Sequence, residues 1–173
     1  MTVIQKKVCL LGDFAVGKTS LVRRFVEGIF EDKYLSTIGA KVDRKTITIQ
    51  TEGQAAALTL LLWDLAGGEK FDRVMSSYYR GAAGAVLVCD LTRSETLQAV
   101  ANYTRDFWSV NPRTPIIVVG NKVDLVEKRA ISDEDLAAMA APHQLPWFVS
   151  SAKTGENVET FFQALGQRLL VTP

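Results

Sequence analysis

The chain has little cysteine, little histidine and almost no net charge. Among its 173 residues are two cysteines, five prolines and one histidine, and its formal net charge is +1. Cys9 and Cys89 both lie in apolar, strand-like runs, which predicts two buried thiols rather than a disulfide or a metal site. A net charge this close to zero gives no indication of a nucleic-acid partner or of an anionic membrane surface.

Targeting and lipid-attachment signals are also missing. The sequence has no secretory signal and no apolar run long enough to cross a membrane. Thr2 stands where myristoylation requires glycine, and the last four residues contain no cysteine for prenylation. We therefore expect a cytoplasmic protein with no lipidation site, and we expect it to be a monomer. Its length and its 47% hydrophobic content predict one globular domain over residues 1–173.

The segment Gly12–Thr19, GDFAVGKT, has the pattern of a phosphate-binding loop: glycine, four residues, glycine, lysine, then serine or threonine. Gly12 and Gly17 lack a Cβ, so the backbone amides of the loop can fold closely around a phosphate. Lys18 supplies a positive charge beside the terminal phosphates, and the Thr19 hydroxyl is placed to ligate Mg²⁺. Such a match arises by chance in roughly one chain of this length in a hundred.

The flanking residues favour a phosphate loop over a chance match. The apolar run Val8–Leu11 precedes the loop as a buried strand would, and apolar residues recur at helical spacing between Leu21 and Val26. We therefore predict a nucleotide site. Its phosphate-binding residues are Gly12, Asp13, Phe14, Ala15, Val16, Gly17, Lys18, Thr19 and Ser20.

Strand-like and helix-like segments alternate along the chain. The predicted strands span 3–11, 42–50, 58–63, 85–89, 116–119 and 147–149. The predicted helices span 18–27, 70–79, 97–108, a segment that follows a capping box at Ser132 and Asp135, and 158–169. The second and third strands form a hairpin around Glu52–Gly53. The pattern predicts an α/β fold: a mostly parallel six-stranded sheet with one antiparallel edge strand and helices on both faces.

A second loop, WDLAG, follows a predicted strand, at the edge where such sheets bind ligands. In WDLAG, Asp64 is placed to hold Mg²⁺, and Gly67 allows its amide to approach a terminal phosphate. An Asp-x-x-Gly sequence alone more often marks a plain turn, but its position after a phosphate loop favours the functional interpretation. The polar, non-periodic segment 28–40 is long for a connection in a compact domain, which also indicates a functional loop.

The segment Asn121–Asp124, NKVD, indicates recognition of a guanine base. The Asp124 carboxylate can accept two parallel hydrogen bonds from the ring and exocyclic N–H groups of guanine, a donor pair that adenine lacks. Asn121 would brace the loop, and the Lys122 stem would cover the face of the base. After the last strand, an amide of Ser151, Ala152 or Lys153 can bond the exocyclic oxygen of guanine, although an ordinary exposed turn is the competing interpretation.

Three other polar residues are interpreted as non-catalytic. His143, the one histidine, lies between Pro142 and Pro146 and is interpreted as a solvated loop residue rather than a catalyst. Arg73 and Arg80 are interpreted as solvated or ion-paired rather than catalytic.

The loop motifs together resemble those of Ras-like small GTPases. GDFAVGKT, YLSTIG, WDLAG, NKVD and SAK occur in the order and spacing of that family, over essentially the whole chain, and SSYYRGA at 76–82 looks most like the Rab branch. The resemblance implies a P-loop NTPase fold, the Ras-like G domain. It also implies a switch that binds GTP, GDP and Mg²⁺ and hydrolyses GTP slowly. Exchange factors, GTPase-activating proteins and effectors would bind through residues 28–42 and 64–80.

The resemblance also implies roles for single residues. Thr37 would join Thr19 and Asp64 on Mg²⁺ only in the GTP state, and Gly67 would sense the γ-phosphate. Phe30 would pack edge-on against the base, and Tyr34 would cover the phosphates. Hydrolysis would depend on the positions of Lys18, Thr37, Gly67 and Gly68.

Three positions depart from the family pattern. Gly68 stands where the family usually has glutamine, Phe14 stands where relatives usually have a small residue, and Val42 replaces a phenylalanine of the Rab effector-binding face. Trp63 and Tyr78 would supply aromatic contacts there or be partly buried in the core. Gly68 keeps open a second hypothesis, a pseudo-GTPase scaffold that binds nucleotide with negligible hydrolysis. An ATP-using phosphate-loop enzyme is disfavoured by NKVD.

Overall fold

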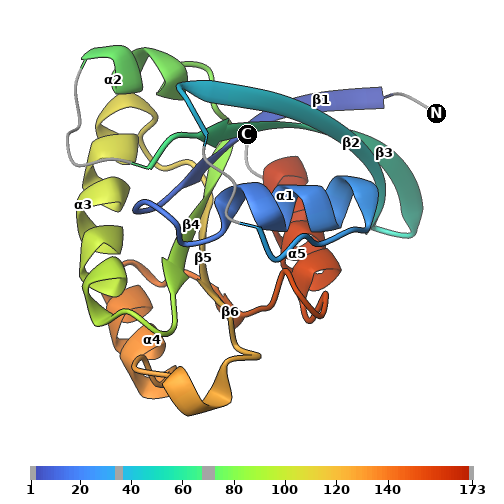
Figure 1. The fold of residues 1–173 in the computed structure, drawn as a ribbon. Helices are drawn as coiled ribbons and strands as arrows, with labels where there is room; N and C mark the ends of the chain where they lie inside the picture. The colour runs from blue at the N-terminus through green and yellow to red at the C-terminus, as the bar shows by residue number, and fades with distance from the viewer. Residues whose placement is uncertain (1–2, 34–36, 68–72, 172–173) are drawn as a thin grey trace.

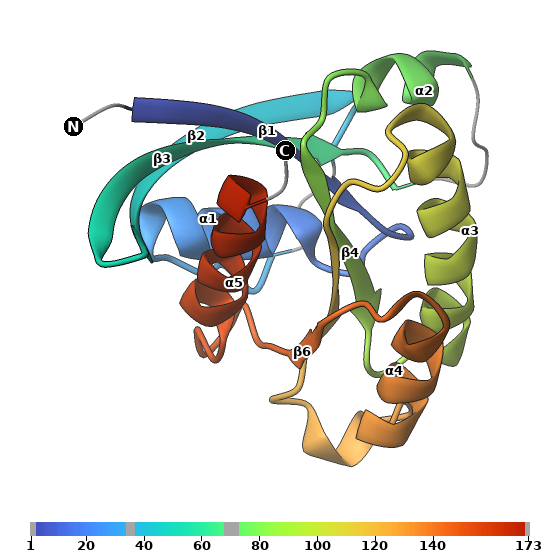
Figure 2. The same cartoon turned by 180° about the vertical axis from the view of Figure 1, so that it is seen from behind.

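The computed structural model describes residues 3–33, 37–67 and 73–171. For residues 73 and 74 it describes the backbone only. A six-stranded sheet has helices on both faces (Figures 1 and 2). The strands are β1 Val3–Leu11, β2 Ala40–Thr51, β3 Gln54–Leu65, β4 Gly84–Asp90, β5 Ile116–Asn121 and β6 Trp147–Val149. The helices are α1 Lys18–Glu27, α2 Arg73–Tyr79, α3 Ser94–Val110, α4 Asp133–Ala140 and α5 Val158–Val171, with 3₁₀ turns at Val126–Lys128 and Ala141–His143.

The strand order is β2-β3-β1-β4-β5-β6, and every neighbouring pair is parallel except β2 with β3. This arrangement confirms the predicted fold class. The β2–β3 hairpin turns at Glu52 and Gly53, whose φ angles of +48° and +79° match a two-residue turn of the type that favours glycine. Both strands are longer than the predicted segments 42–50 and 58–63. Backbone pairing runs from the pair of Ala40 with Leu65 to the pair of Thr51 with Gln54, and it continues through polar residues.

The sheet separates two layers of core. Val8 and Leu10 face the layer formed with α1 and α5, whereas Cys9 and Leu11 face the layer formed with α2, α3 and α4. This alternation follows from the period of two in a strand, and the central strands are apolar on both faces because both faces are covered. Between α1 and α5, the rings of Phe25 and Phe162 stack with centroids 3.9 Å apart.

Both cysteines are buried free thiols, as predicted. Burial raises the pKa of Cys9 and of Cys89 to about 12. The capping box at Ser132 and Asp135 is confirmed: the Asp135 amide donates to Ser132 Oγ at 3.1 Å, and the Ser132 amide donates to Asp135 Oδ2 at 2.9 Å.

The interpretation of His143 as a solvated residue is confirmed, but the residue does not lie in a plain loop. His143 is exposed, but it ends a 3₁₀ turn, and its ring contacts Trp108 of α3 edge-on with centroids 5.1 Å apart. Arg80 is exposed, as expected. The predicted helix 70–79 is seen from Arg73 onward, and Lys70 lies outside the described residues. Within the ranges that the structure describes, no helix combines the length and apolar character needed to span a membrane.

The carboxyl ends of β1, β3, β4, β5 and β6 lie along one edge of the sheet, where the chain leaves each strand into a polar loop. Helix α1 starts at this edge, after Gly17, and is capped at its C-terminal end by Gly28, whose φ is +73° and whose amide donates to Arg24 O. The parallel topology therefore brings the predicted motifs to one place.

Candidate functional site

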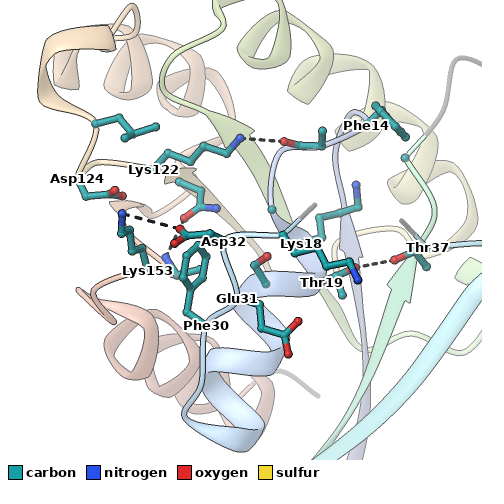
Figure 3. A pocket seen from close by; sticks show the side chains of 18 of the residues that line it. Phe14, Lys18, Thr19, Phe30, Glu31, Asp32, Thr37, Lys122, Asp124 and Lys153 are labelled. Atoms are coloured by element: carbon teal, nitrogen blue, oxygen red, sulfur yellow. Dashed lines mark hydrogen bonds and ion pairs between the residues drawn. The ribbon is translucent and has the colours of Figure 1, made fainter. Parts of the chain in front are cut away.

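A cavity of about 320 Å³ lies at this edge (Figure 3). Its lining brings together fourteen of the predicted site residues: Phe14, Ala15, Gly17, Lys18, Thr19, Ser20, Phe30, Thr37, Gly67, Asn121, Lys122, Asp124, Ala152 and Lys153. Five further predicted residues do not line the cavity, but each is hydrogen-bonded to a residue that does: Gly12, Asp13, Val16, Asp64 and Ser151. The expectations for Tyr34 and Gly68 lie outside the described residues.

At the phosphate loop, the Lys18 ammonium is held by the loop itself. Nζ donates to the carbonyl oxygen of Gly12 at 2.8 Å and to that of Asp13 at 3.0 Å. Burial lowers the pKa of Lys18 to about 8, against the attraction of Asp64 and Asp13. Gly12 must be glycine because an added Cβ would lie 2.3 Å from the carbonyl oxygen of Val88. The loop thus keeps one cation at the floor of the cavity.

Two residues of NKVD hold the outer side of the phosphate loop. Asn121 Nδ2 donates to Val16 O at 3.0 Å, and Lys122 Nζ donates to Ala15 O at 3.1 Å. A Cβ at Gly17 would lie 2.2 Å from Asn121 Nδ2, so only glycine allows this approach. The base motif and the phosphate loop are therefore one connected structure.

Three oxygen-bearing side chains meet beside Lys18. The Thr19 hydroxyl donates to Asp64 Oδ2 at 2.6 Å and lies 2.6 Å from the Thr37 hydroxyl, which is 3.4 Å from the same carboxylate oxygen. Asp64 is 1% exposed, and its Oδ1 has no hydrogen-bond partner among the described residues. Burial raises the pKa of Asp64, opposed by the Thr19 hydrogen bond and by Lys18.

Hydroxyl and carboxylate oxygens are the ligands that Mg²⁺ prefers, and Mg²⁺ sites use few carboxylates because substrate phosphates and water complete them. The unpaired Oδ1 of Asp64 and the two hydroxyls fit such an ion. Within the described part of the chain, no group of three or more His, Cys, Asp or Glu side chains forms a metal cluster. The three side chains are therefore a candidate metal site.

Gly67 lies directly against the phosphate loop. A Cβ at this residue would come 2.6 Å from the Phe14 amide nitrogen and 2.8 Å from Asp13 O. The loop after β3 can therefore approach the phosphate loop only because residue 67 has no side chain. Phe14 itself borders the cavity with 57% of its surface exposed.

At the opposite end of the cavity, Asp124 and the loop after β6 are joined. Ser151 Oγ donates to Asp124 Oδ1 at 2.7 Å, and the Ala152 amide donates to Asn121 Oδ1 at 3.2 Å. Arg24 of α1 holds this loop from behind, because its Nε donates to Ala152 O at 2.8 Å and its Nη2 donates to Lys153 O. The predicted base-binding residues are thus held together by side-chain contacts.

Residues 30–33 border the same end, and sequence reasoning identified only Phe30 among them. Lys153 Nζ lies 3.9 Å from Asp32 Oδ1, and Figure 3 shows this pair beside Phe30 and Asp124. Arg23 Nη2 lies 3.3 Å from Glu31 Oε1. The first ion pair joins the segment after α1 to the loop after β6, and the second joins the same segment to α1.

Trp63 and Tyr78, the two aromatic residues singled out in the sequence, contact each other. The rings of Trp63 and Tyr78 lie 6.4 Å apart, and both are partly buried against the core, in agreement with the more conservative of the two interpretations. Lys7 Nζ lies 3.8 Å from the centroid of the Trp63 ring. Val42, paired with Trp63 across the hairpin, is 50% exposed, and Ile38 is 93% exposed.

Sequence reasoning missed Arg24, Asp32, Asp90 and Arg93. Asp90 and Arg93 form an ion pair of 3.1 Å, and Arg93 Nη2 donates to Phe14 O at 2.8 Å. The position of Asp90 at the end of a buried strand was a usable signal, because other site residues occupy the same place on neighbouring strands. Nothing in the pattern marked Arg24 or Arg93.

Comparison with known proteins gives consistent results. The family model described as the Ras family matches residues 7–171. The chain is 39% identical over 168 residues to the GTP-binding protein ypt5 of Schizosaccharomyces pombe, covering 96% of this chain and 78% of the relative. It is 36% identical over 166 residues to the Ras-related protein Rab-13 of Canis lupus familiaris, covering 95% and 80%. It is 36% identical over 170 residues to the Ras-related protein Rab-22A of Mus musculus, covering 98% and 86%.

Proposed function

Since the chain belongs to the Ras family, with relatives in its Rab branch, and is a GTPase that converts GTP to GDP and phosphate, we propose that it is a molecular switch. In this proposal GTP orders the segments around Thr37 and Gly67, and hydrolysis releases them. The observation that carries the proposal is the meeting of Thr19, Thr37 and Asp64 beside Lys18. It supports a direct link between the segment that contains Thr37 and the phosphate end of the cavity.

Thr19, Thr37 and Asp64 would hold Mg²⁺ in this proposal. The bound ion would neutralise charge that develops on the β- and γ-phosphate oxygens. Thr37 contributes the switching, because its segment, unlike those of Thr19 and Asp64, is neither helix nor strand. A contact available only in the GTP state biases only that state.

The other residues of the phosphate end would bind and position the nucleotide. On binding, the Lys18 ammonium would exchange the carbonyls of Gly12 and Asp13 for phosphate oxygens, which are stronger acceptors because they are charged. The amides of the loop and the start of α1 would bind the remaining phosphate oxygens. The amide of Gly67 would reach the γ-phosphate.

The base would lie between Phe30 and the Lys122 stem, with guanine selected by Asp124. Only Oδ1 of Asp124 is used by Ser151, so the carboxylate keeps acceptor capacity for two guanine N–H groups. An amide of the loop 151–153 would donate to the exocyclic oxygen of guanine. Adenine offers neither the donor pair nor that acceptor, so it would leave polar groups unpaired.

The similarity to Rab and Ypt GTPases favours the switch over the pseudo-GTPase scaffold. We propose slow hydrolysis, because Gly68 brings no side chain to orient the attacking water. Regulators and effectors would contact residues 28–42 and 64–80. Monomeric state and cytoplasmic residence remain predictions.

Hydrogen exchange in two nucleotide states tests the switch. With Mg²⁺ and a non-hydrolysable GTP analogue, residues 28–33, 37–40 and 73–79 should be more protected than with GDP. Thr37→Ala should remove most of that difference while leaving GDP affinity almost unchanged. Thr46→Ala, at an exposed threonine of β2 that contacts Thr59, is the matched control and should behave as the parent protein. Equal protection in both states would favour the scaffold.

A further inference from the structure

Three successive carbonyl groups of the phosphate loop are each bonded from outside the loop. Phe14 O accepts from Arg93 Nη2 at 2.8 Å, Ala15 O from Lys122 Nζ at 3.1 Å, and Val16 O from Asn121 Nδ2 at 3.0 Å. Asn121 and Lys122 belong to the predicted base motif. Arg93, which precedes α3, belongs to no motif found in the sequence.

The direction of a carbonyl fixes the direction of the next amide. In a planar trans peptide, C=O and the following N–H point in opposite directions, and no cis bond occurs in the described chain. A carbonyl that is bonded outside the loop therefore turns the next amide toward the inside. By this geometry, Arg93 directs the amide of Ala15, just as Lys122 and Asn121 direct those of Val16 and Gly17.

This arrangement needs outside support because the loop backbone is unfavourable by itself. Ala15 has a φ of +63°, in the left-handed region that residues with a Cβ rarely adopt. Successive amides in such a conformation form a concave anion site, yet they repel one another when no anion is present. Hydrogen bonds to the outward carbonyls would hold the loop ready before the nucleotide arrives.

Asp90 fixes the two cationic members of this set. Its Oδ2 lies 3.1 Å from Arg93 Nε and 2.8 Å from Lys122 Nζ, and its Oδ1 accepts from the amide and the hydroxyl of Thr92 at 2.9 and 2.6 Å. The Asp90 side chain is 2% exposed. Because four donors hold this buried carboxylate, it restrains both cationic side chains beside the phosphate loop.

We propose that Arg93, anchored by Asp90, is a positioning residue for nucleotide binding that turns the Ala15 amide toward the phosphates. The inference rests on the proposed binding of nucleotide phosphates at this loop. Arg93 acts only through the backbone of Phe14, so it raises phosphate affinity without touching the ligand. The alternative is a structural role at the start of α3, because Arg93 is the residue immediately before the first turn of that helix.

The two roles differ in which ligands are affected. The amides of the phosphate loop bind the α- and β-phosphates. GMP has no β-phosphate, so a loop amide contributes more to the binding of GDP than to the binding of GMP. Loss of the charge-assisted hydrogen bond from Arg93 to Phe14 O should weaken GDP binding by about tenfold. A structural defect would instead weaken GDP and GMP in equal proportion.

The experiment compares Arg93→Met with the parent protein and with Arg105→Met. Arg105 is a matched control, because it lies on α3, its side chain is 74% exposed and its ion pair with Asp106 is 3.7 Å. We would measure GDP and GMP affinities by competition, and the release rate of a fluorescent GDP analogue. Arg93→Met should lower the preference for GDP over GMP about tenfold and speed release, whereas Arg105→Met should change neither.

Arg93→Lys is the second variant, in case the methionine variant unfolds. Lysine can keep the ion pair with Asp90, but a single ammonium does not reproduce the fork that also reaches Phe14 O, so an intermediate loss of GDP preference is expected. An unchanged preference in both folded variants, or in Arg93→Lys alone if the other is unfolded, would overturn the inference. Failure of the parent protein to bind GDP would overturn the proposed function as well.

Discussion

Arg24 Nε donates a hydrogen bond to the carbonyl oxygen of Ala152 at 2.8 Å, across 128 positions of the chain. The same guanidinium donates to Lys153 O and, at 3.1 Å, to Gly28 O. One side chain therefore joins α1, the loop after β6 and the start of the segment that leads to Thr37. The loop after β6 and residues 30–33 of that segment border the end of the cavity assigned to the base.

We predict that Arg24→Met speeds the release of GDP and GTP by about tenfold, because hydrogen bonds from a charged donor are each worth about 1.5–3 kcal/mol. Release of a fluorescent nucleotide from the purified protein measures this. Arg23→Met is the matched control, since its ion pairs with Glu27 and Glu31 are exposed and should contribute little. Equal release rates for the two variants would contradict the prediction.

Asp124→Asn should change which base is bound. The substitution places a donor opposite the guanine N–H groups, and an unmatched pair costs about 1–3 kcal/mol, so GTP affinity should fall at least tenfold. Xanthosine triphosphate, with an oxygen in place of the exocyclic amine, should gain affinity. Competition binding measures both, and a variant that still prefers GTP would show that the base assignment is wrong.

Intrinsic GTP hydrolysis should be at or below about 10⁻⁴ s⁻¹, the order of the intrinsic rate of Ras. Gly68→Gln should raise it by giving the attacking water an orienting side chain, provided that Phe14 leaves room. Single-turnover hydrolysis by the parent, Gly68→Gln, and Gly68→Gln with Phe14→Ser tests both residues. A parent rate clearly above the Ras value would refute the assignment, and Arg73 would then be tested first.

Phe162→Ala should destabilise the protein by about 3–5 kcal/mol, because it empties a fully buried position that stacks on Phe25. Denaturant unfolding at a fixed nucleotide concentration measures the change. Val126→Ala, at a 74% exposed side chain, is the control and should alter stability by less than about 0.5 kcal/mol. A loss below 1 kcal/mol for Phe162→Ala would mean that α5 packs differently.

The thiols of Cys9 and Cys89 should not react with iodoacetamide at pH 8 in the folded protein. Burial raises each thiol pKa to about 12, so almost no thiolate is present and the reagent has no access. Mass spectrometry should find two modified cysteines only after denaturation. Rapid labelling of either thiol in the native state would contradict the buried positions.

The motifs were predictable because their chemistry depends on side chains at short, regular spacing. A loop that binds phosphate needs glycine, lysine and a hydroxyl within a few residues, and a strand or helix shows its buried faces as a period of 2 or 3.6. The order of these segments also predicted the sheet and the edge along which Thr19, Asp64 and Asp124 would lie. The aromatic contact of His143 was missed, because its partner lies on a helix distant in sequence.

By itself, the sequence determined the fold class and the residues expected to meet phosphate, metal and base. Tertiary structure alone decided how those residues are held. Arg24 bonds the loop after β6, Arg93 bonds the phosphate loop, and Lys122 pairs with Asp90. The acceptors in most of these contacts are backbone carbonyl oxygens, which every residue carries, so no residue type or spacing marks them. Strand order and register bring donor and acceptor together only when the whole sheet has formed.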